Sequence, residues 1–193
     1  YLYNNPLTCR GGVQRRPWYA VPCCPSNLSR TWADIGRYIY STRQDQLCIH
    51  QYISSRLPAE TIPLKDGNTA TLSLEMDAAL PWHGHVRLKM DEISCPDPEQ
   101  VILLEIQVRQ PVWAGSMCVR INEEPAITYS PASPDENDAP ASGYDPRLAV
   151  FQSLRYPWSM GDIIEIDFEM PIQLRRAHPK VKGHSGKVAV TRG

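Results

Sequence analysis

The chain has 193 residues, which is enough for one large domain or for one domain and part of another. Its formal net charge of −1 at pH 7 gives no electrostatic footprint for nucleic acid, so we expect no nucleic-acid partner. No run approaches the roughly 18 to 20 apolar residues of a membrane span, so a membrane protein is not predicted. Apolar residues make up 42% of the chain, which is enough for a core, so a disordered chain is not predicted either.

The two ends and the cysteines indicate what kind of chain this is. It begins Tyr1-Leu2-Tyr3 without a methionine and ends at Thr191-Arg192-Gly193 in an apparent strand, so we expect a piece of a longer protein. The six cysteines lack the tight spacing of a disulfide scaffold, and a chain of this length does not need such cross-links. We therefore expect thiols in a reducing compartment, which predicts a cytoplasmic location.

The N-terminal part is predicted to be a loop followed by one helix. Residues 1–22 contain Asn, Gly and Pro residues that interrupt any regular pattern. Pro25 fits the first position of a helix, where a missing N–H is no loss, and the helix is predicted over residues 25–40. Leu28, Trp32, Ile35 and Ile39 recur at helical spacing and form an apolar stripe.

After this helix the hydrophobic period changes to two, which predicts strands. The expected strands are residues 47–53, 70–76, 85–90, 101–108, 117–122, 149–152 and 163–170. Residues 101–108 are the most apolar of these and suit a central position in a sheet. Short strands with turn residues between them and no intervening helices predict a mainly β fold, an antiparallel β-sandwich of jelly-roll-like type.

The last third of the chain holds a predicted loop and a predicted exit from the sandwich. Residues 129–146 are rich in Pro, Ser, Asp and Ala, so we expect a surface loop. Residues 171–193 leave the sandwich, and residues 187–190 begin a strand whose partner we expect to lie outside this chain. Basic residues cluster at Arg175, Arg176, Lys180 and Lys182, and we interpret them first as a solvated rim.

Cys23 and Cys24 are the residues that most strongly suggest chemistry. They lie at or just before the predicted helix N-terminus, where the partial positive charge favours thiolate over thiol. A thiolate in that position is either a nucleophile or a soft metal ligand. The alternative is that both cysteines are small buried apolar residues without chemistry. Neighbouring cysteines cannot bridge each other without strain, so a disulfide between them is not expected.

The histidines offer a weaker candidate metal site. His83 and His85 would share a face if their segment were extended, so both could reach one ion. Pro81, Trp82 and Gly84 favour a turn there instead, and no third ligand is near in the sequence. Zinc-binding Cys-x-x-Cys and His-Glu-x-x-His motifs are also missing from the chain.

The N-terminal motifs carry a resemblance to a known family. The runs Tyr3-Asn4-Asn5-Pro6-Leu7, Trp18 and Cys23-Cys24-Pro25-Ser26-Asn27-Leu28-Ser29-Arg30 resemble those of the beta-L-arabinofuranosidase-type glycoside hydrolases of family 127. Later landmarks follow in the same order: Gly36 to Ser41, Pro81 to Leu88, Trp158 to Asp162, Met170-Pro171-Ile172, Ala177-His178-Pro179 and Gly186 to Gly193. The resemblance covers nearly the whole chain, and the Cys-Cys-Pro-x-Asn run is its specific part.

The resemblance implies a division of the chain. Residues 1–43 would be the C-terminal piece, the last loop and helix, of an (α/α) barrel catalytic domain. Residues 44–175 would form the β-sandwich, and residues 176–193 the start of a following β segment. Cys23 falls on the family's nucleophile and zinc ligand, Cys24 on a second zinc ligand, and Tyr3 on an active-site tyrosine that contacts the substrate.

The implied reaction is retaining glycoside hydrolysis of a carbohydrate substrate with sulfur in place of the usual carboxylate. A glutamic acid would protonate the leaving oxygen and then deprotonate the incoming water. The family's Glu-x-Cys zinc ligands and its acid/base glutamate are missing here, and no glutamate precedes Glu60. The catalytic barrel upstream, in the same parent chain or on a partner chain, would have to supply them, so this chain alone is expected to be inactive.

Two functions therefore compete. The first is a zinc-dependent glycosidase with a cysteine nucleophile, acting on beta-L-arabinofuranosides or a related glycan. The second is a non-catalytic carbohydrate-binding or scaffolding β-sandwich whose Cys23 and Cys24 are buried and inert. In the first loop, Trp18, Tyr19 and the neighbouring arginines are candidate sugar contacts, with loop packing as the alternative.

Overall fold

A computed structural model describes residues 11–12, 20–21, 23–97, 101–131 and 150–192. The chain divides into two units, residues 1–38 and residues 39–193. No helix in the described part of the chain is long and apolar enough to cross a membrane.

The first unit holds the predicted helix, which is shorter than expected. The helix α1 spans Cys23–Ala33, and a 3-10 helix spans Ile35–Tyr38. The last turn of α1 is closed by a hydrogen bond from the Asp34 N–H to the Arg30 carbonyl oxygen at 3.1 Å. The expectation that one helix continues to residue 40 is wrong, because Tyr40 already pairs as a strand residue with Ile49.

The predicted apolar stripe does not act as one surface. Leu28 and Trp32 are exposed in the described part of the chain, and Ile39 is buried in the core of the second unit. The helical spacing therefore predicted the helix correctly, but its apolar positions belong to two different environments.

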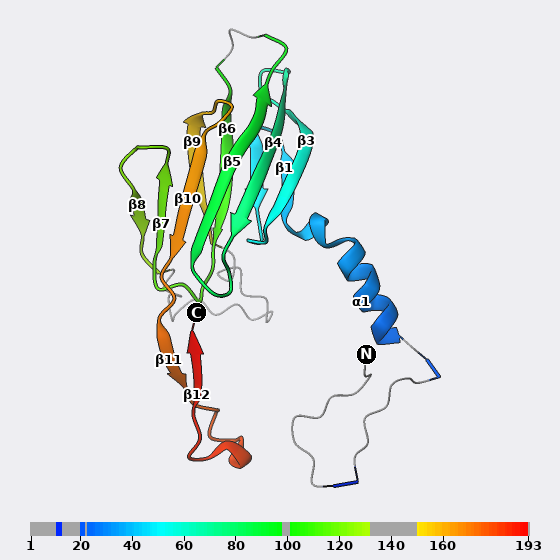
Figure 1. Ribbon diagram of the computed structural model, residues 1–193, viewed down its shortest axis with the longest axis vertical. Coiled ribbons are helices and arrows are strands. Elements are labelled where there is room, and N and C mark those ends of the chain that lie inside the picture. Colours follow the sequence, from blue (N-terminus) through cyan, green and yellow to red (C-terminus); the bar gives the residue numbers. More distant parts are fainter. Residues whose placement is uncertain (1–10, 13–19, 22, 98–100, 132–149, 193) are drawn as a thin grey trace. The chain divides into compact units, whose positions relative to one another are not determined.

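The second unit is built of strands, most of which Figure 1 labels. Their bounds are β1 Tyr40–Arg43, β2 Gln46–Ile49, β3 Ser55–Pro63, β4 Thr69–Ala78, β5 His85–Ser94, β6 Leu103–Gln110, β7 Met117–Ile121, β8 Ile127–Tyr129, β9 Val150–Pro157, β10 Ile163–Phe168, β11 Ile172–Arg175 and β12 Ala189–Arg192. A short 3-10 helix, Lys182–His184, lies between β11 and β12.

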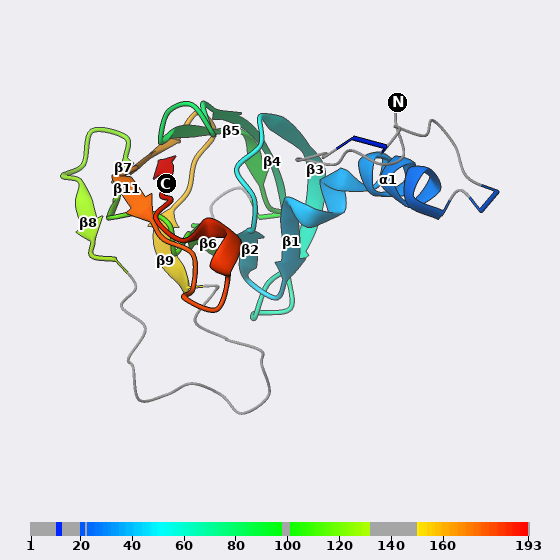
Figure 2. The same cartoon turned by 90° about the horizontal axis from the view of Figure 1, so that it is seen from below.

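Two of the three sheets form the predicted sandwich. One has the order β1-β2-β6-β9 and the other the order β3-β4-β5-β10-β7-β8. Figure 2 shows them as two layers facing each other. All neighbouring strands are antiparallel except β2 and β6, which are parallel. The mainly β, antiparallel sandwich class is confirmed.

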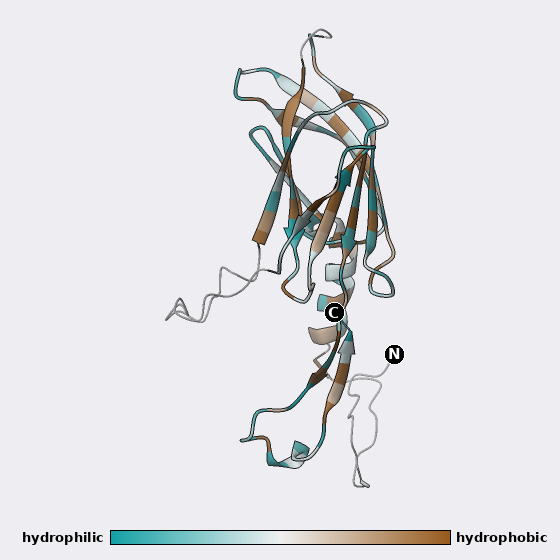
Figure 3. Ribbon diagram, turned by 90° about the vertical axis from the view of Figure 1, so that its left-hand side faces the viewer, coloured by the Kyte–Doolittle hydropathy of each residue, from teal (hydrophilic) through white to brown (hydrophobic). Residues whose placement is uncertain are grey.

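Alternating burial along the strands creates the core between these sheets. Leu72, Leu74 and Met76 of β4 are buried, as the period of two predicted, and the residues between them are less buried. The same alternation holds for β5, β6 and β10, and Figure 3 shows it as brown and teal residues taking turns along the strands. Burial of each large apolar side chain stabilises the fold by about 1.5–3 kcal/mol.

Four strands, β1, β3, β8 and β11, and the pairing of β12 were not predicted. The strand β3 contains Pro58 and Pro63, which argue against a strand in sequence reasoning, and it lies at the edge of its sheet, where proline is tolerated. The strand β12 pairs antiparallel with β11 inside this chain, with Ile172 opposite Arg192. The expectation that its partner lies elsewhere is therefore wrong. Most of the loop predicted over residues 129–146 lies outside the described residues.

Glu105 is a charged residue buried on the outer face of the four-stranded sheet. Only 7% of its surface is exposed. Its carboxylate accepts hydrogen bonds from Ser153 Oγ, from Gln107 Nε2 at 3.1 Å and from Gln46 Nε2 at 2.9 Å. These hydrogen bonds, with a smaller contribution from the positive charge of Arg155, lower the pKa of Glu105 from 4.5 to about 2 although burial opposes the shift.

We predict that Glu105→Gln destabilises the protein in a pH-dependent way. The ionised carboxylate contributes stability that is fully present above pH 4.5 and is lost as the pH falls through about 2. The variant should therefore lose about 1–3 kcal/mol at pH 7 and markedly less at pH 3. Urea unfolding at both pH values measures this. Glu75→Gln, at an exposed position of β4, is the control. An equal loss at both pH values would contradict the interpretation.

Gly84 makes a close backbone contact that a side chain would break. It precedes β5, and its carbonyl oxygen accepts the Phe168 N–H at 2.9 Å. A Cβ atom at this position would clash with the Phe168 carbonyl oxygen, which is backbone and cannot rotate away. The contact closes the end of the β5–β10 pair.

We predict that Gly84→Ala lowers the unfolding free energy by about 1–3 kcal/mol, because one of the two backbones must shift. Gly183→Ala is the matched control, since a Cβ there meets no atom within 4 Å. Thermal unfolding of both variants measures the difference. Equal melting temperatures for the two variants would show that the contact does not constrain the sandwich.

Candidate functional site

Cys23 and Cys24 occupy the first turn of α1. The helix begins at Cys23, so Pro25 is its third residue and not its first, as the sequence predicted. The first four N–H groups of a helix have no partner within the helix. The missing N–H of Pro25 therefore costs no helical hydrogen bond at this position either, which explains why the helix can begin earlier.

The local geometry brings the two sulfur atoms together on the surface of their unit. The Sγ atoms of Cys23 and Cys24 lie 3.6 Å apart, and both residues are exposed. Ser26 Oγ donates a hydrogen bond to the Cys23 carbonyl oxygen at 3.0 Å, which holds the first turn. The first turn contains no acidic residue, so the helix N-terminus keeps its partial positive charge beside the thiols.

These two thiols fit half of a zinc site. Two thiolates at about 2.3 Å from a tetrahedral zinc ion lie about 3.8 Å apart, and the observed 3.6 Å separation is close to this value. Sulfur is also a ligand that zinc prefers. Within the described ranges no group of three or more His, Cys, Asp or Glu residues gathers, so these residues supply two donors and not a complete ligand set.

The other predicted site residues lie outside the described part of the chain. Tyr3, the expected substrate contact, belongs to residues 1–10, and Trp18 and Tyr19 belong to residues 13–19. Their roles stay predictions.

The histidine pair considered as a metal site has other roles. Trp82 and His83 both donate their N–H to the Ala79 carbonyl oxygen at 3.0 Å, which forms the turn that the sequence favoured. His85 opens β5, and its Nδ1 lies 2.9 Å from the Asp167 Oδ1 of the neighbouring strand β10. His85 therefore contacts a carboxylate, and among the residues that the structure describes no third donor gathers with the two histidines.

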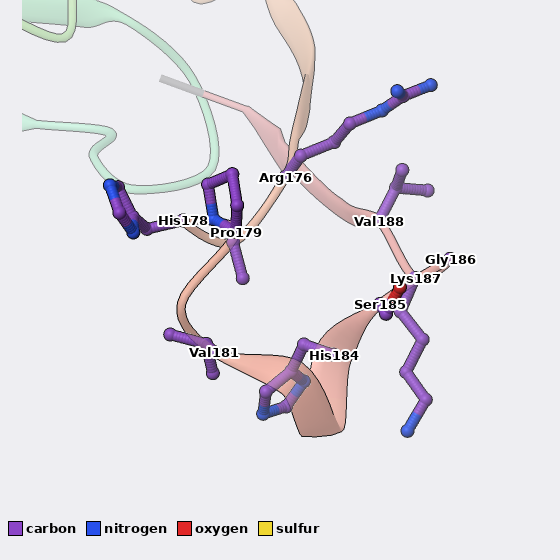
Figure 4. Close-up of a pocket in the computed structure, with 10 residues that line it drawn as sticks. Arg176, His178, Pro179, Val181, His184, Ser185, Gly186, Lys187 and Val188 are labelled. Atoms are coloured by element: carbon purple, nitrogen blue, oxygen red, sulfur yellow. The ribbon is translucent and has the colours of Figure 1, made fainter.

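The basic C-terminal segment surrounds a hollow of about 380 Å³. Its lining includes Arg176, His178, His184 and Lys187. Figure 4 shows the side chains of Arg176 and Lys187 extending away from this hollow. The residues of the predicted basic cluster are all exposed, which agrees with its interpretation as a solvated rim: Arg175, Arg176, Lys180 and Lys182.

Comparisons with known proteins identify the second unit and extend to the first. The profile of the family described as "Beta-L-arabinofuranosidase, GH127 middle domain" matches residues 46–170. The chain is 28% identical over 195 residues to a non-reducing end beta-L-arabinofuranosidase of Bifidobacterium longum subsp. longum. This similarity covers 98% of the chain and 25% of that protein.

Solved structures give the same result. A GH127 beta-L-arabinofuranosidase from Geobacillus stearothermophilus T6 matches with a TM-score of 0.63 and 30% identity over 93% of this chain and 24% of that one. A second GH127 beta-arabinofuranosidase matches with a TM-score of 0.67 and 25% identity over 100% of this chain and 28% of that one. The chain thus spans about a quarter of the relatives that it matches.

We predict that zinc protects Cys23 and Cys24 selectively from alkylation. Under reducing conditions iodoacetamide should modify both before Cys48, which is only 6% exposed. Added Zn²⁺ should slow modification of the pair several-fold, because a thiolate bound to zinc is a weaker nucleophile. The half-buried Cys118 is the internal control and should not respond. Peptide mass spectrometry measures each rate, and equal protection of all cysteines would contradict a paired site.

Proposed function

The chain belongs to the GH127 beta-L-arabinofuranosidase family, and we propose that its parent protein is a retaining glycosidase with Cys23 as its nucleophile. The observation that supports this most is the pair of exposed thiols, 3.6 Å apart, at the N-terminus of α1. The relatives named above supply the substrate class, beta-L-arabinofuranosides or a related glycan. The proposal assigns the chemistry to the first unit.

Cys23 would act by two successive displacements at the anomeric carbon. In the first, a sulfur–carbon bond forms while the glycosidic carbon–oxygen bond breaks, and the leaving oxygen takes a proton from a carboxylic acid. In the second, water loses a proton to that carboxylate and attacks the same carbon, and the sulfur leaves as thiolate. Two inversions give overall retention of configuration.

Cys24 would be a ligand and not a nucleophile. With two further donors, Cys23 and Cys24 would hold a zinc ion, whose charge would keep the Cys23 sulfur ionised near neutral pH. The backbone N–H groups of the first helical turn favour the same negative charge. The hydrogen bond from Ser26 Oγ to the Cys23 carbonyl oxygen stabilises the first turn of α1.

The proton donor and the remaining zinc ligands would lie outside this chain. The first glutamate of the sequence is Glu60, and it lies on β3 of the sandwich unit. The relatives are about four times longer than the stretch that they share with this chain. We therefore propose that the (α/α) barrel of the parent protein supplies these groups, and that this chain alone does not hydrolyse glycosides.

We predict that Cys23→Ser in the parent protein lowers kcat/KM for a beta-L-arabinofuranoside by at least about 1000-fold, because a serine hydroxyl at that place is not ionised. Cys24→Ser should lower both activity and bound zinc. The control is Cys118→Ser on β7, which should change neither. The rate with an aryl glycoside and the zinc content by atomic absorption measure these effects.

The alternative function gives the opposite result. In a sandwich that only binds carbohydrate or acts as a scaffold, Cys23→Ser and Cys118→Ser would leave hydrolysis by the parent protein equally unchanged. Full activity of the Cys23→Ser protein would therefore overturn the proposed function.

A further inference from the structure

The sandwich unit contains a second hollow, of about 260 Å³, that the proposed chemistry does not use. Its walls come from segments far apart in the sequence. The residues that matter for its chemistry are Gln51, Tyr52, Arg109, Trp113, Met170 and Arg192. Arg109 lies on β6 and Arg192 on β12, so the hollow joins the sandwich to the β11–β12 ribbon.

Arg109 is a cation without a counter-charge in the described part of the chain. Its Nε is buried and has no hydrogen-bond partner there, and its Nη2 donates only one long hydrogen bond, 3.3 Å, to Gln51 Oε1. The described residues place no carboxylate oxygen within 4.0 Å of this guanidinium. The Arg109 side chain is half-buried, so its guanidinium is in part accessible to a ligand, and an anion there would supply the missing counter-charge.

Two other buried side-chain atoms lack a hydrogen bond, but each faces a cation. Asp45 Oδ2 lies 3.2 Å from Lys65 Nζ, and Asp91 Oδ2 lies 3.0 Å from Arg56 Nη2. Ion pairing explains both atoms. Of these three buried atoms in the described part of the chain, only Arg109 Nε belongs to a group without an ion-pair partner.

Tyr52 and His50 are two titratable residues whose pKa values are affected by the charge of Arg109. Tyr52 donates its hydroxyl hydrogen to the Arg109 carbonyl oxygen, and burial raises the pKa of Tyr52, so its phenol stays protonated. Burial and, secondly, the positive charge of Arg109 lower the pKa of His50. Neither residue can supply the missing negative charge.

Arg192 adds a second guanidinium to the same hollow. Its Nη1 donates to the Trp82 carbonyl oxygen at 3.2 Å, and it too has no carboxylate within 4.0 Å in the described part of the chain. Two cationic side chains that line one hollow favour an anion beside them. Arginine forks suit a carboxylate, which accepts two parallel hydrogen bonds.

The remaining wall is apolar and aromatic. Trp113 and Tyr52 both contact Phe168 of β10, with ring centroids 5.5 Å and 5.0 Å apart, which fixes their orientation. Met170 and Leu80 complete this wall. Ligand sites commonly combine such a surface with a few polar groups, and a volume below about 300 Å³ suits one small ring and not a long oligomer.

We propose that this hollow binds a uronate, a sugar unit that carries a carboxylate, with the carboxylate between Arg109 and Arg192 and the ring against Trp113. The choice of a sugar rests on the proposed function, and the choice of an anion rests on the two guanidinium groups. Its residues all belong to the second unit, and it would select glycans that contain acidic units.

The test is a titration of the 193-residue chain followed by tryptophan fluorescence and by ligand-detected NMR. The probes are methyl α-D-galacturonate, the neutral methyl α-D-galactoside and acetate. We expect saturable binding of the galacturonate. Binding of the galactoside and of acetate should be at least about tenfold weaker, because the galactoside lacks the carboxylate and acetate lacks the sugar ring. Equal binding of the galactoside or of acetate would overturn the uronate assignment, as would no binding of the galacturonate.

The variants identify the site. Arg109→Gln and Arg192→Gln should each weaken galacturonate binding at least about tenfold. Arg109→Gln should keep its unfolding midpoint, because it removes an unpaired charge. Arg43→Gln is the matched control, since Arg43 lies on the edge strand β1 opposite Gln46, at the other end of the sheet from Arg109. If Arg109→Gln and Arg192→Gln both fold and bind galacturonate as the unmodified chain does, the proposal is overturned.

Galacturonate binding and the proposed role of Cys23 can be tested independently. Cys23→Ser abolishes hydrolysis by the parent protein if the nucleophile is assigned correctly, and it leaves galacturonate binding unchanged. Loss of galacturonate binding in Cys23→Ser would contradict a site that is separate from the thiols.

Discussion

The period-two burial of apolar side chains is the constraint on which the sandwich depends. On β4, β5, β6 and β10 every second residue lies between the two sheets, and a shift of one residue would turn each core side chain toward solvent. Once this register is fixed, the alternate residues of β6 must face outward. Glu105 then meets its donors from β2 and β9, and Arg109 lies four residues further along the same strand, at the hollow.

The sequence predicted the parts of the fold that follow from local pattern. Leu72, Leu74 and Met76 alternate with polar residues, so their strand and its buried face could be read directly. The strand β3 could not, because Pro58 and Pro63 are tolerated only through its position at a sheet edge, which no local pattern reveals. The start of α1 was placed too late because Pro25 is acceptable at any position of the first turn.

The two candidate sites also differ in how far the sequence could predict them. Cys23 and Cys24 are neighbours in the sequence, so their chemistry was visible in the motif, and the structure adds the 3.6 Å separation of the sulfurs. Arg109 and Arg192 are 83 residues apart in the sequence, and only the fold brings them to one hollow. The observation that pointed to this hollow is that, among the described residues, the buried Nε of Arg109 has no hydrogen-bond partner. This can be recognised only when the surroundings of the side chain are known.

The central claim is that the Cys23 sulfur takes the sugar from its glycosidic oxygen. The most direct measurement is peptide mass spectrometry of the parent protein, quenched in acid during steady-state turnover of an aryl beta-L-arabinofuranoside. The account predicts one pentosyl group on the peptide that contains Cys23 and none on that peptide in a sample quenched before substrate is added. A pentosyl group found instead on an aspartate or glutamate peptide would contradict it.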